Sequence, residues 1–422
     1  MTFYLCTYCN TFVYDDISGD KRANLQLGTK LRNIPESWRC PVCKQPKTYL
    51  KEISKDDFIA RKEKYDGFYS KKVDDKKKDI VDYMNIAREK LVGICAVNKV
   101  CDGNPDRLCM GLKYGRSIGF GGAGQGRTFD NNFKALENYK LKMRVIKEHH
   151  EPVMETIFLG KKIVMPLMVS SMSGVKISMN DVIPEADFQR AMIEGAKLFG
   201  TIGLSGNTVD FPDHPGIEVI KENNGWGIPV FKPQSQERLL KLFKRAEEAN
   251  VIAIGVDLDG YGSTNWALRG KPLYRKSKKE LRELVDATDK PVIFKGIMNI
   301  EDAAKVVDSG AKAVDISNHG GRVLDFGQGV ADVLPKIADE FKGKITIMAD
   351  GAIRTGFDIL KILALGADIA LVGRPIGRMA LAGGAEAVKL HLDFFRKDLR
   401  MAMVMTGCGN LNEISKDILI KD

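Results

Sequence analysis

Four cysteines near the start of the chain form two close pairs, Cys6-Thr-Tyr-Cys9 and Cys40-Pro-Val-Cys43. Each pair can place two thiolates along one edge of a tetrahedron, and the loop between the pairs lets both edges face one metal ion. Disulfides or free thiols are the alternative, but paired spacing of this kind is typical of metal sites. The spacing therefore predicts a four-cysteine metal site and leaves iron and zinc both open.

A second group of reactive side chains follows short apolar runs later in the chain. Lys295 ends the run Pro-Val-Ile-Phe-Lys, and Asp257 ends Val-Ile-Ala-Ile-Gly-Val-Asp. His319 and Arg322 stand in the string Ser-Asn-His-Gly-Gly-Arg. A histidine near an arginine offers a proton acceptor beside a carboxylate clamp. A lysine at the end of a buried strand would lie against the electron-rich side of a bound ring.

Small residues with arginines follow two further apolar runs. Residues 349–354 read Ala-Asp-Gly-Ala-Ile-Arg, and residues 372–375 read Val-Gly-Arg-Pro. Where side chains are small, backbone N–H groups can approach a phosphate closely, and a guanidinium can bridge its oxygens. These two segments predict a phosphate pocket.

The elements that would position these groups form a repeating pattern in the second half of the chain. Eight apolar runs alternate with amphipathic helical stretches, which indicates buried parallel strands joined by helices. The runs are Ile163–Ser171, Thr201–Ser205, Ile228–Phe231, Val251–Asp257, Pro291–Lys295, Ala313–Ser317, Ile345–Asp350 and Asp368–Gly373. Eight strand–helix units predict an α/β fold of the (β/α)8 TIM-barrel type, in which function lies at the carboxyl ends of the strands. An open doubly wound sheet is the alternative, but no Gly-x-Gly-x-x-Gly turn follows the first strand.

Length and composition restrict the classes of protein. The chain has 422 residues, 44% of them hydrophobic, which suits a small domain plus a large barrel. The net charge of +10 reflects basic runs such as Lys76–Lys78 that lack interleaved aromatic residues, so a nucleic-acid surface is not expected. No apolar run is long enough to span a membrane. The absence of a signal peptide and the paired cysteines favour a reducing cytoplasm.

Residues 1–51 closely resemble rubredoxin, which holds one redox-active iron in four cysteine thiolates. The resemblance depends on the two cysteine pairs together with Tyr14-Asp15, Gly28-Thr29, Pro35 and Trp38. It implies iron bound by Cys6, Cys9, Cys40 and Cys43, and a small apolar core of Tyr4, Phe12, Tyr14, Trp38 and Tyr49. Asn10 and Lys44 depart from the family, which prefers glycine on both turns. A structural zinc ribbon is the alternative.

Residues 121–415 resemble the FMN-dependent α-hydroxy-acid oxidases and dehydrogenases, the family of glycolate oxidase, lactate oxidase and flavocytochrome b2. The string Ser-Asn-His-Gly-Gly-Arg is the most specific part of the match. The resemblance implies that His319 takes the substrate proton and that Arg322 binds the substrate carboxylate. It implies that Asp257 orients His319 and that Lys295 lies by flavin N1. The residues implied to contact FMN are Ser171, Met172, Ser205, Asp350, Gly351, Arg354, Gly373 and Arg374.

The departures from this family concern the substrate side of the site. The family has a tyrosine near Ile118, a second catalytic tyrosine in the position of the run Phe231-Lys232-Pro233-Gln234, and a second substrate arginine after the fourth strand. Tyr114 or Tyr261 could supply a displaced hydroxyl. The loop from Asp257 to Trp266 also resembles type 2 isopentenyl diphosphate isomerase, a related FMN barrel that uses flavin without net redox change.

A third group of cysteines, Cys95, Cys101 and Cys109, precedes the barrel. Three thiolates within a short segment leave free thiols, a disulfide and an additional metal or iron–sulfur cluster all open. Related barrels of anaerobes carry a denser cysteine run here. The expected organisation is a rubredoxin-like domain at 1–51, linker helices and the cysteine segment at 52–120, and the FMN barrel at 121–422.

The sequence therefore predicts an FMN-dependent oxidoreductase that converts a small 2-hydroxy acid to the 2-oxo acid and exchanges electrons with the fused rubredoxin iron. Two alternatives stay open: a reductase in which the iron supplies electrons to FMN, and a non-redox FMN isomerase with a structural zinc module. We expect a homo-oligomer, as is common among the resembling barrels, and a separate redox partner protein is compatible with the iron site.

Overall fold

The computed structural model describes residues 1–20, 23–74, 78–91, 122–148, 150–179, 181–211 and 214–421. The chain divides into two compact units, Met1–Lys78 and Asp79–Asp422. The hypothesised cluster of Cys95, Cys101 and Cys109 lies outside the described residues, as do Tyr114 and Ile118.

An antiparallel sheet forms the centre of the first unit. Strand β1 (Phe3–Cys6) lies between β2 (Val13–Asp15) and β3 (Leu50–Ile53), and the 3-10 helices η2 (Leu31–Asn33) and η3 (Lys47–Tyr49) follow β2 in the chain.

The aromatic core of this unit is nearly the predicted one. Tyr4, Phe12, Tyr14 and Trp38 are buried, and Trp38 Nε1 donates a 2.9 Å hydrogen bond to the carbonyl of Ala23. Tyr49 was expected in the core but is 39% exposed. Its ring lies edge-on to that of Tyr8 at the surface, with 5.4 Å between ring centroids.

Helix α1 (Lys55–Asp74) adds two aromatic side chains to this core. The Phe58 ring lies 4.7 Å from that of Phe3, and the Tyr65 ring meets Phe12 edge-on at 5.2 Å between centroids. Both side chains are buried. The segment after β3, which the sequence indicated only as linker helix, therefore stabilises the metal module.

Within the described part of the chain, eight parallel strands close into a barrel, which confirms the predicted fold class and excludes the open sheet. Each strand overlaps one of the predicted apolar runs. The strands are β7 (Leu167–Met172), β8 (Gly203–Ser205), β9 (Ile228–Phe231), β10 (Ile254–Asp257), β11 (Val292–Ile297), β12 (Ala313–Ile316), β13 (Thr346–Ala349) and β14 (Ile369–Val372).

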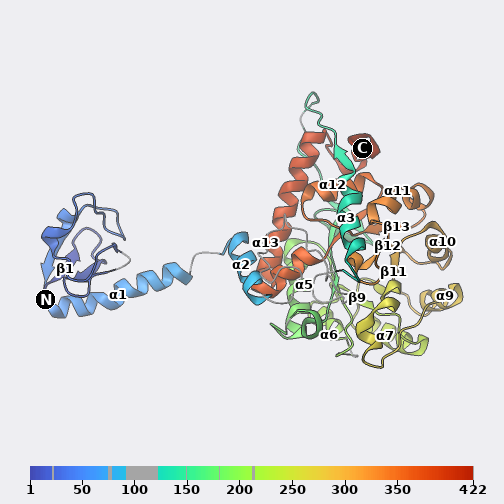
Figure 1. The fold of residues 1–422 in the computed structure, drawn as a ribbon, viewed down its shortest axis with the longest axis horizontal. Helices are drawn as coiled ribbons and strands as arrows, with labels where there is room; N and C mark the ends of the chain where they lie inside the picture. The colour runs from blue at the N-terminus through green and yellow to red at the C-terminus, as the bar shows by residue number, and fades with distance from the viewer. Residues whose placement is uncertain are drawn as a thin grey trace. The chain divides into compact units, whose positions relative to one another are not determined.

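Helices surround the barrel, one long helix after each strand (Figure 1). They are α5 (Glu185–Phe199), α6 (Pro215–Glu222), α7 (Gln236–Glu248), α9 (Lys278–Asp286), α10 (Ile300–Asp308), α11 (Val330–Phe341), α12 (Gly356–Ala364) and α13 (Arg374–Thr406). Ser235, Ser277, Asn299 and Thr355 accept N-terminal backbone N–H groups of α7, α9, α10 and α12. These side-chain caps fix the residue at which each helix begins, and so they fix the end of the loop that precedes each helix.

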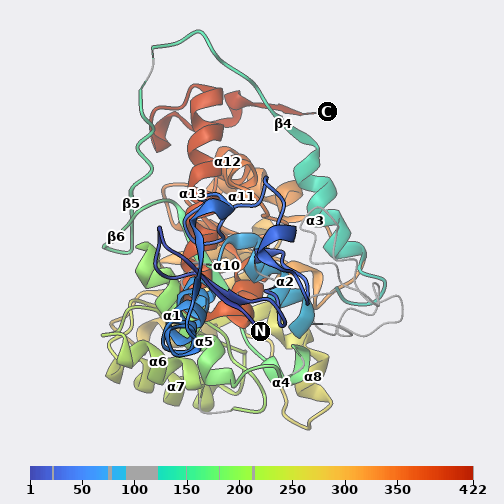
Figure 2. The same cartoon turned by 90° about the vertical axis from the view of Figure 1, so that its left-hand side faces the viewer.

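Several elements lie outside the strand–helix repeat. Helix α3 (Arg127–Glu137) is followed by β4 (Tyr139–Leu141), which pairs with β15 (Leu419–Lys421) near the C-terminus, and a long loop leads on to the hairpin of β5 (Thr156–Phe158) and β6 (Lys161–Ile163) (Figure 2).

Helix α2 (Ile80–Lys90) packs against α13 at a break in that helix. Gly383 and Gly384 have non-helical backbone angles, and a Cβ on Gly383 would lie only 2.0 Å from the Tyr83 ring. Lys90 Nζ donates to the carbonyl of Leu381 at 2.6 Å. Of the described helices, none is both long and apolar enough to cross a bilayer.

Candidate active site

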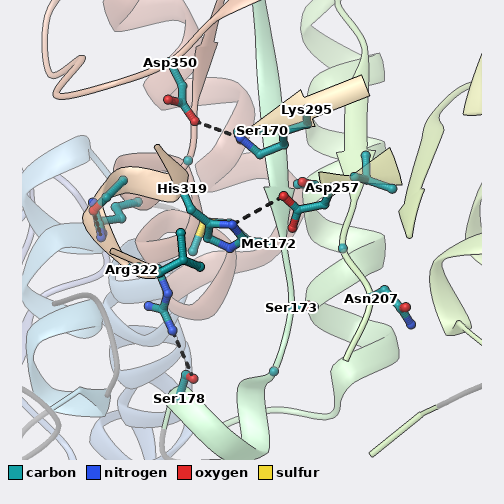
Figure 3. Close-up of a pocket in the computed structure, with 18 of the residues that line it drawn as sticks. Ser170, Met172, Ser173, Ser178, Asn207, Asp257, Lys295, His319, Arg322 and Asp350 are labelled. Atoms are coloured by element: carbon teal, nitrogen blue, oxygen red, sulfur yellow. Dashed lines mark hydrogen bonds and ion pairs between the residues drawn. The ribbon is translucent and has the colours of Figure 1, made fainter. Parts of the chain in front are cut away.

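A pocket with about 1330 Å³ of empty space, part of it open to solvent, lies at the carboxyl ends of the barrel strands. It is lined by Asp257 at the end of β10, by His319 and Arg322 after β12, and by residues of β7 and the start of α13. The short helices η4 (Leu258–Gly262) and α8 (Thr264–Ala267) follow β10, η5 (His319–Gly321) follows β12, and α4 (Val175–Ser178) follows β7. In Figure 3, the His319 ring is directed toward Asp257, and the Arg322 side chain is directed toward Ser178.

A left-handed turn after β12 projects His319 into the pocket. His319, Gly320 and Gly321 have φ values of 56°, 60° and 77°, a conformation that only glycine adopts at little cost. Asn318 holds the turn because its Oδ1 accepts the Gly321 N–H at 3.1 Å. Asn318 and Asn132 of α3 also exchange two 2.9 Å side-chain hydrogen bonds, which fix the turn to that helix.

Two carboxylates face the same nitrogen of His319. Its Nδ1 lies 3.2 Å from Asp259 Oδ1 and 3.4 Å from Asp257 Oδ1. Burial, the largest single influence, would lower the pKa of His319, but the charges of Asp257 and Asp259 together with the hydrogen bond to Asp257 outweigh it and raise the pKa. Burial and the neighbouring charge of Asp257 raise the pKa of Asp259 to about 6. Asp257 stays ionised, because the charges of His319 and Lys232 overcome its burial and hold its pKa well below the usual value.

The other nitrogen of His319 faces a lysine that sequence reasoning noted only as a departure from the family. Lys232 follows β9, and its Nζ lies 3.4 Å from His319 Nε2 and forms a hydrogen-bonded ion pair with Asp257 Oδ2. The sequence could have indicated Lys232, because it directly follows an apolar run, just as Lys295 ends one. Asp259, the second carboxylate at Nδ1, was not predicted, because it stands two residues beyond Asp257, the last residue of the strand.

Lys295 lies deep in the pocket among acidic groups. Its Nζ contacts Ser317 Oγ, Asp350 Oδ2 at 3.1 Å and Asp315 Oδ2 at 3.0 Å. Burial opposes the charged form, yet Asp315 and Asp350 raise the pKa of Lys295 well above its usual value. Burial raises the pKa of Asp315 to about 7. Asp315 was not predicted, because it stands inside the apolar run of β12 and no strand-end position marks it.

The two predicted phosphate-binding arginines are held by aromatic rings of α3. The Arg354 guanidinium stacks on Phe133 at 5.1 Å, and that of Arg374 stacks on Phe129 at 4.5 Å from the ring centroid. Arg374 Nη2 also donates to the carbonyl of Gly320 at 2.8 Å. Both arginines line the pocket together with Gly351 and Gly373. Asp350 also lines it, with its side chain directed to Lys295.

The remaining predicted flavin contacts divide into two groups. Ser171 and Met172 line the pocket. The Ser205 side chain is instead directed toward α6, because a Cβ on Gly216 of that helix would lie only 2.5 Å from Ser205 Oγ. Asn207 and Thr208 form the pocket wall after β8. Asn207 Nδ2 and Thr208 Oγ1 are buried and have no hydrogen-bond partner among the described residues.

This donor set fits FMN. Unpaired buried amide and hydroxyl groups can meet the polar edge of a flavin, and the buried ammonium of Lys295 can meet the ring where negative charge develops. The glycine-rich loops with Arg354 and Arg374 suit a phosphate at the far end.

Arg322 lies on the same side of the pocket as His319 (Figure 3). Its Nη2 is 3.5 Å from Ser178 Oγ of α4. Trp266, Val323 and Met179 line the pocket as well and give it apolar surface. An arginine in this setting can bind a carboxylate through two parallel hydrogen bonds.

The first unit contains a separate candidate metal centre. Cys6 Sγ lies 3.7 Å from Cys43 Sγ, and Cys9 Sγ lies 3.9 Å from Cys40 Sγ, with all four sulfurs within 4.8 Å of one another. This spacing suits four thiolates around one tetrahedral ion.

Asn10 and Lys44, which stand where the rubredoxin family prefers glycine, preserve the geometry of the two turns at this centre. Asn10 and Lys44 have φ values of 52° and 66°, and their N–H groups each donate a 2.9 Å hydrogen bond to Cys6 and Cys40 carbonyls. The left-handed conformation costs roughly 1–2 kcal/mol for a residue with a Cβ. The two substitutions therefore leave the turn geometry intact at some cost in stability.

Comparison with known proteins gives two matches to family models. The model described as FMN-dependent dehydrogenase matches residues 117–272 and 271–421, and the model described as rubredoxin matches residues 3–50.

Among curated proteins, the chain is 31% identical over 359 residues to an L-lactate dehydrogenase of Ectopseudomonas mendocina (strain ymp), covering 72% of this chain and 93% of that protein. An L-lactate dehydrogenase of Vibrio parahaemolyticus is 28% identical over 357 residues, covering 71% of this chain and 93% of that protein.

Among solved structures, mandelate oxidase with (S)-2-phenylpropionate shares 25% identity with a TM-score of 0.65, covering 82% of this chain and 98% of that one. A flavocytochrome b2 variant shares 25% identity with a TM-score of 0.62, covering 71% of this chain and 80% of that one.

Proposed function

Because this chain belongs to the FMN-dependent dehydrogenase family and carries a rubredoxin domain ahead of the barrel, we propose that it oxidises a small 2-hydroxy acid and passes the electrons to the rubredoxin metal. The observation that carries the proposal is the pairing of His319, held at Nδ1 by two carboxylates, with Arg322 in one pocket. The similarity to L-lactate dehydrogenases and mandelate oxidase supports the substrate class.

Arg322 would bind the substrate carboxylate and so place the C2 hydroxyl near His319. Because Nδ1 of His319 faces Asp257 and Asp259, the nitrogen available to a substrate hydroxyl is Nε2. His319 would take the hydroxyl proton there, and the nearby negative charge would stabilise the resulting imidazolium. FMN, when bound, supplies the acceptor for the two electrons and the hydrogen of C2.

The rest of the pocket would hold the cofactor. Arg354 and Arg374, each stacked on a ring of α3, would bind the phosphate, and Lys295 would lie beside the ring. Ser171, Met172, Gly351 and Gly373 would contact it through backbone or small side chains. Asp350 would act mainly through Lys295, which it contacts at 3.1 Å.

The four-cysteine centre would serve as a one-electron partner of FMN. Rubredoxin similarity favours iron in this site, and the covalent link between the two units raises their effective concentration and removes a diffusional encounter. We propose that Cys6, Cys9, Cys40 and Cys43 hold this iron.

Anaerobic absorbance spectroscopy of the purified protein, with metal analysis, tests the proposal. Addition of 2-hydroxy acids of increasing side-chain size should bleach the flavin bands and then those of the iron centre. His319→Ala should retain FMN but lose reduction by substrate. A Cys9→Ser variant should keep flavin reduction while losing the iron signal. Zinc in place of iron, or no reduction by any hydroxy acid, would contradict the proposal; reduction of FMN through the iron alone would indicate the opposite direction of flow.

A further inference from the structure

We propose that Lys232 is a catalytic residue that binds the C2 oxygen of the substrate together with His319, an inference that rests on the proposed function. The resembling family has a catalytic tyrosine after the third strand, where this chain has the run Phe231-Lys232-Pro233-Gln234. Here Lys232 lines the pocket, with a side chain only 12% exposed and paired with Asp257.

The neighbours of Lys232 fix the position of its ammonium group. Asp257 Oδ2 accepts one of its N–H groups, and His319 Nε2 lies 3.4 Å from Nζ. Gly260 of η4 makes room for the stem, because a Cβ there would lie 2.7 Å from Lys232 Cδ and 3.2 Å from Nζ. The backbone is held as well, since the Lys232 N–H donates to Asn207 Oδ1 at 3.3 Å.

The position of this ammonium group determines what it can contact. A substrate hydroxyl that donates to His319 Nε2 must approach the nitrogen that Lys232 faces. An oxygen at hydrogen-bonding distance from Nε2, about 2.8 Å, can also lie within reach of an ammonium 3.4 Å from that nitrogen. Lysine has three N–H donors, so the bond to Asp257 leaves others for the substrate.

A cation at this oxygen would help the reaction in both directions. During oxidation the hydroxyl proton passes to His319 Nε2, the C2 hydrogen leaves with its electron pair to FMN, and the C2–O single bond becomes a carbonyl. Negative charge builds on the oxygen as its proton leaves, and a positioned ammonium stabilises that charge. In reduction of a 2-oxo acid, the same ammonium would polarise the carbonyl. The carboxylate of Asp257 offsets the repulsion between the Lys232 ammonium and a protonated His319, because its Oδ2 faces Lys232 and its Oδ1 faces His319.

Ligand binding separates this role from a general electrostatic one. Pyruvate has a C2 oxygen, and propionate has the same carboxylate and carbon chain without it. Binding of each to the FMN-loaded full chain can be followed by the change in the flavin spectrum, without turnover. Lys232→Met, which keeps the length of the side chain, should weaken pyruvate binding by about 10- to 100-fold, the range for a hydrogen bond to a charged group, and leave propionate binding nearly unchanged.

Three variants make the test sharper. Lys241→Met removes a lysine of α7 that is paired with Glu237 at the surface, and it should change neither affinity. Gly260→Ala should reproduce part of the Lys232→Met effect by displacing the ammonium without removing it. Lys232→Arg, which keeps the charge, should recover part of the preference for pyruvate. FMN content and melting temperature show whether each variant is folded.

The inference is overturned if Lys232→Met weakens pyruvate and propionate equally, since Lys232 would then act on the carboxylate or on folding. It is also overturned if the wild-type protein binds pyruvate no better than propionate. Neither result depends on whether hydroxy acids reduce the flavin, so failure of the proposed function would be seen separately in the reduction experiment.

Discussion

Asp257 and Asp259 both face Nδ1 of His319, and we predict that replacing one of them has a far smaller effect than replacing both. At an effective dielectric constant of about 20, charges at 3.4 Å and 3.2 Å each attract the imidazolium by about 5 kcal/mol before solvation costs. Asp259 has a pKa of about 6, partly because Asp257 is charged. In Asp257→Asn that repulsion disappears, so Asp259 ionises more readily and replaces the lost charge. In Asp259→Asn, Asp257 is already ionised.

The sign of the pH effect follows from the raised pKa of His319. In the proposed mechanism His319 acts as a base when neutral, so the rate of flavin reduction should rise as pH increases through that pKa. Removing negative charge lowers the pKa, which moves the rising limb to lower pH and reduces the limiting rate. Each single variant should shift the rising limb of the pH–rate profile by less than about one pH unit, which corresponds to about 1.4 kcal/mol. The double variant should shift it by more than about two units and lower the limiting rate by about 10³-fold.

Anaerobic stopped-flow measurement of flavin reduction between about pH 5 and pH 9 provides the assay, since this range includes the titration of a histidine. Asp259→Asn is the cleaner single variant, because Asp257→Asn also removes the partner of Lys232. FMN content and melting temperature serve as controls for folding. Additive effects of the two substitutions, or a rising limb that moves to higher pH, would refute the shared role of the carboxylates.

Further predictions concern the reduction potential of bound FMN, the metal of the four-cysteine centre and the pH dependence of protein stability. Asp315→Asn leaves Lys295 less neutralised, so the two-electron potential of bound FMN should rise by about 30 mV or more in a dye-equilibration titration, and an unchanged potential would contradict this role. Removing the metal with a chelator, or Cys43→Ser, should abolish the cooperative unfolding of the first unit in calorimetry while the barrel transition persists. Burial lowers the pKa of His214 to about 4, below its unfolded value of about 6.5, so its contribution to stability is lost as pH falls below about 6.5. His214→Phe should therefore reduce the loss of stability between pH 7 and pH 5 by about 2 kcal/mol in denaturant titrations, whereas an unchanged pH profile would show that His214 is not the group responsible.

The barrel was predictable because buried parallel strands have a strong signature in the sequence. Each of the eight apolar runs became a strand, and the reactive residues at the ends of the strands meet in one pocket because parallel strands end at the same face. The cysteine pairs were predictable for a similar reason, since their spacing alone restricts where the sulfurs can lie.

Residues that act through contacts distant in sequence could not be predicted. Phe129 and Phe133 support Arg374 and Arg354 across more than 200 positions of chain, and no local pattern relates them. Asp315 interrupts an apolar strand, where the pattern leads one to expect another aliphatic side chain. Tyr65 of α1 stands between charged residues in the sequence, and only the three-dimensional packing shows that it enters the core of the metal module.

The departures from the family are therefore better understood as one rearrangement than as separate losses. The run after the third strand contains Lys232 and lacks the family's tyrosine, and Asp259 is the second carboxylate at Nδ1 of His319. The Lys232 ammonium faces Nε2 while the two carboxylates face Nδ1, so the pKa of His319 is raised although an ammonium lies 3.4 Å away. If Lys232 binds the C2 oxygen as proposed, positive charge in the pocket lies at that oxygen as well as at the carboxylate that Arg322 would bind. Substrate selection should then depend strongly on that oxygen, which is the property that the comparison of pyruvate with propionate measures.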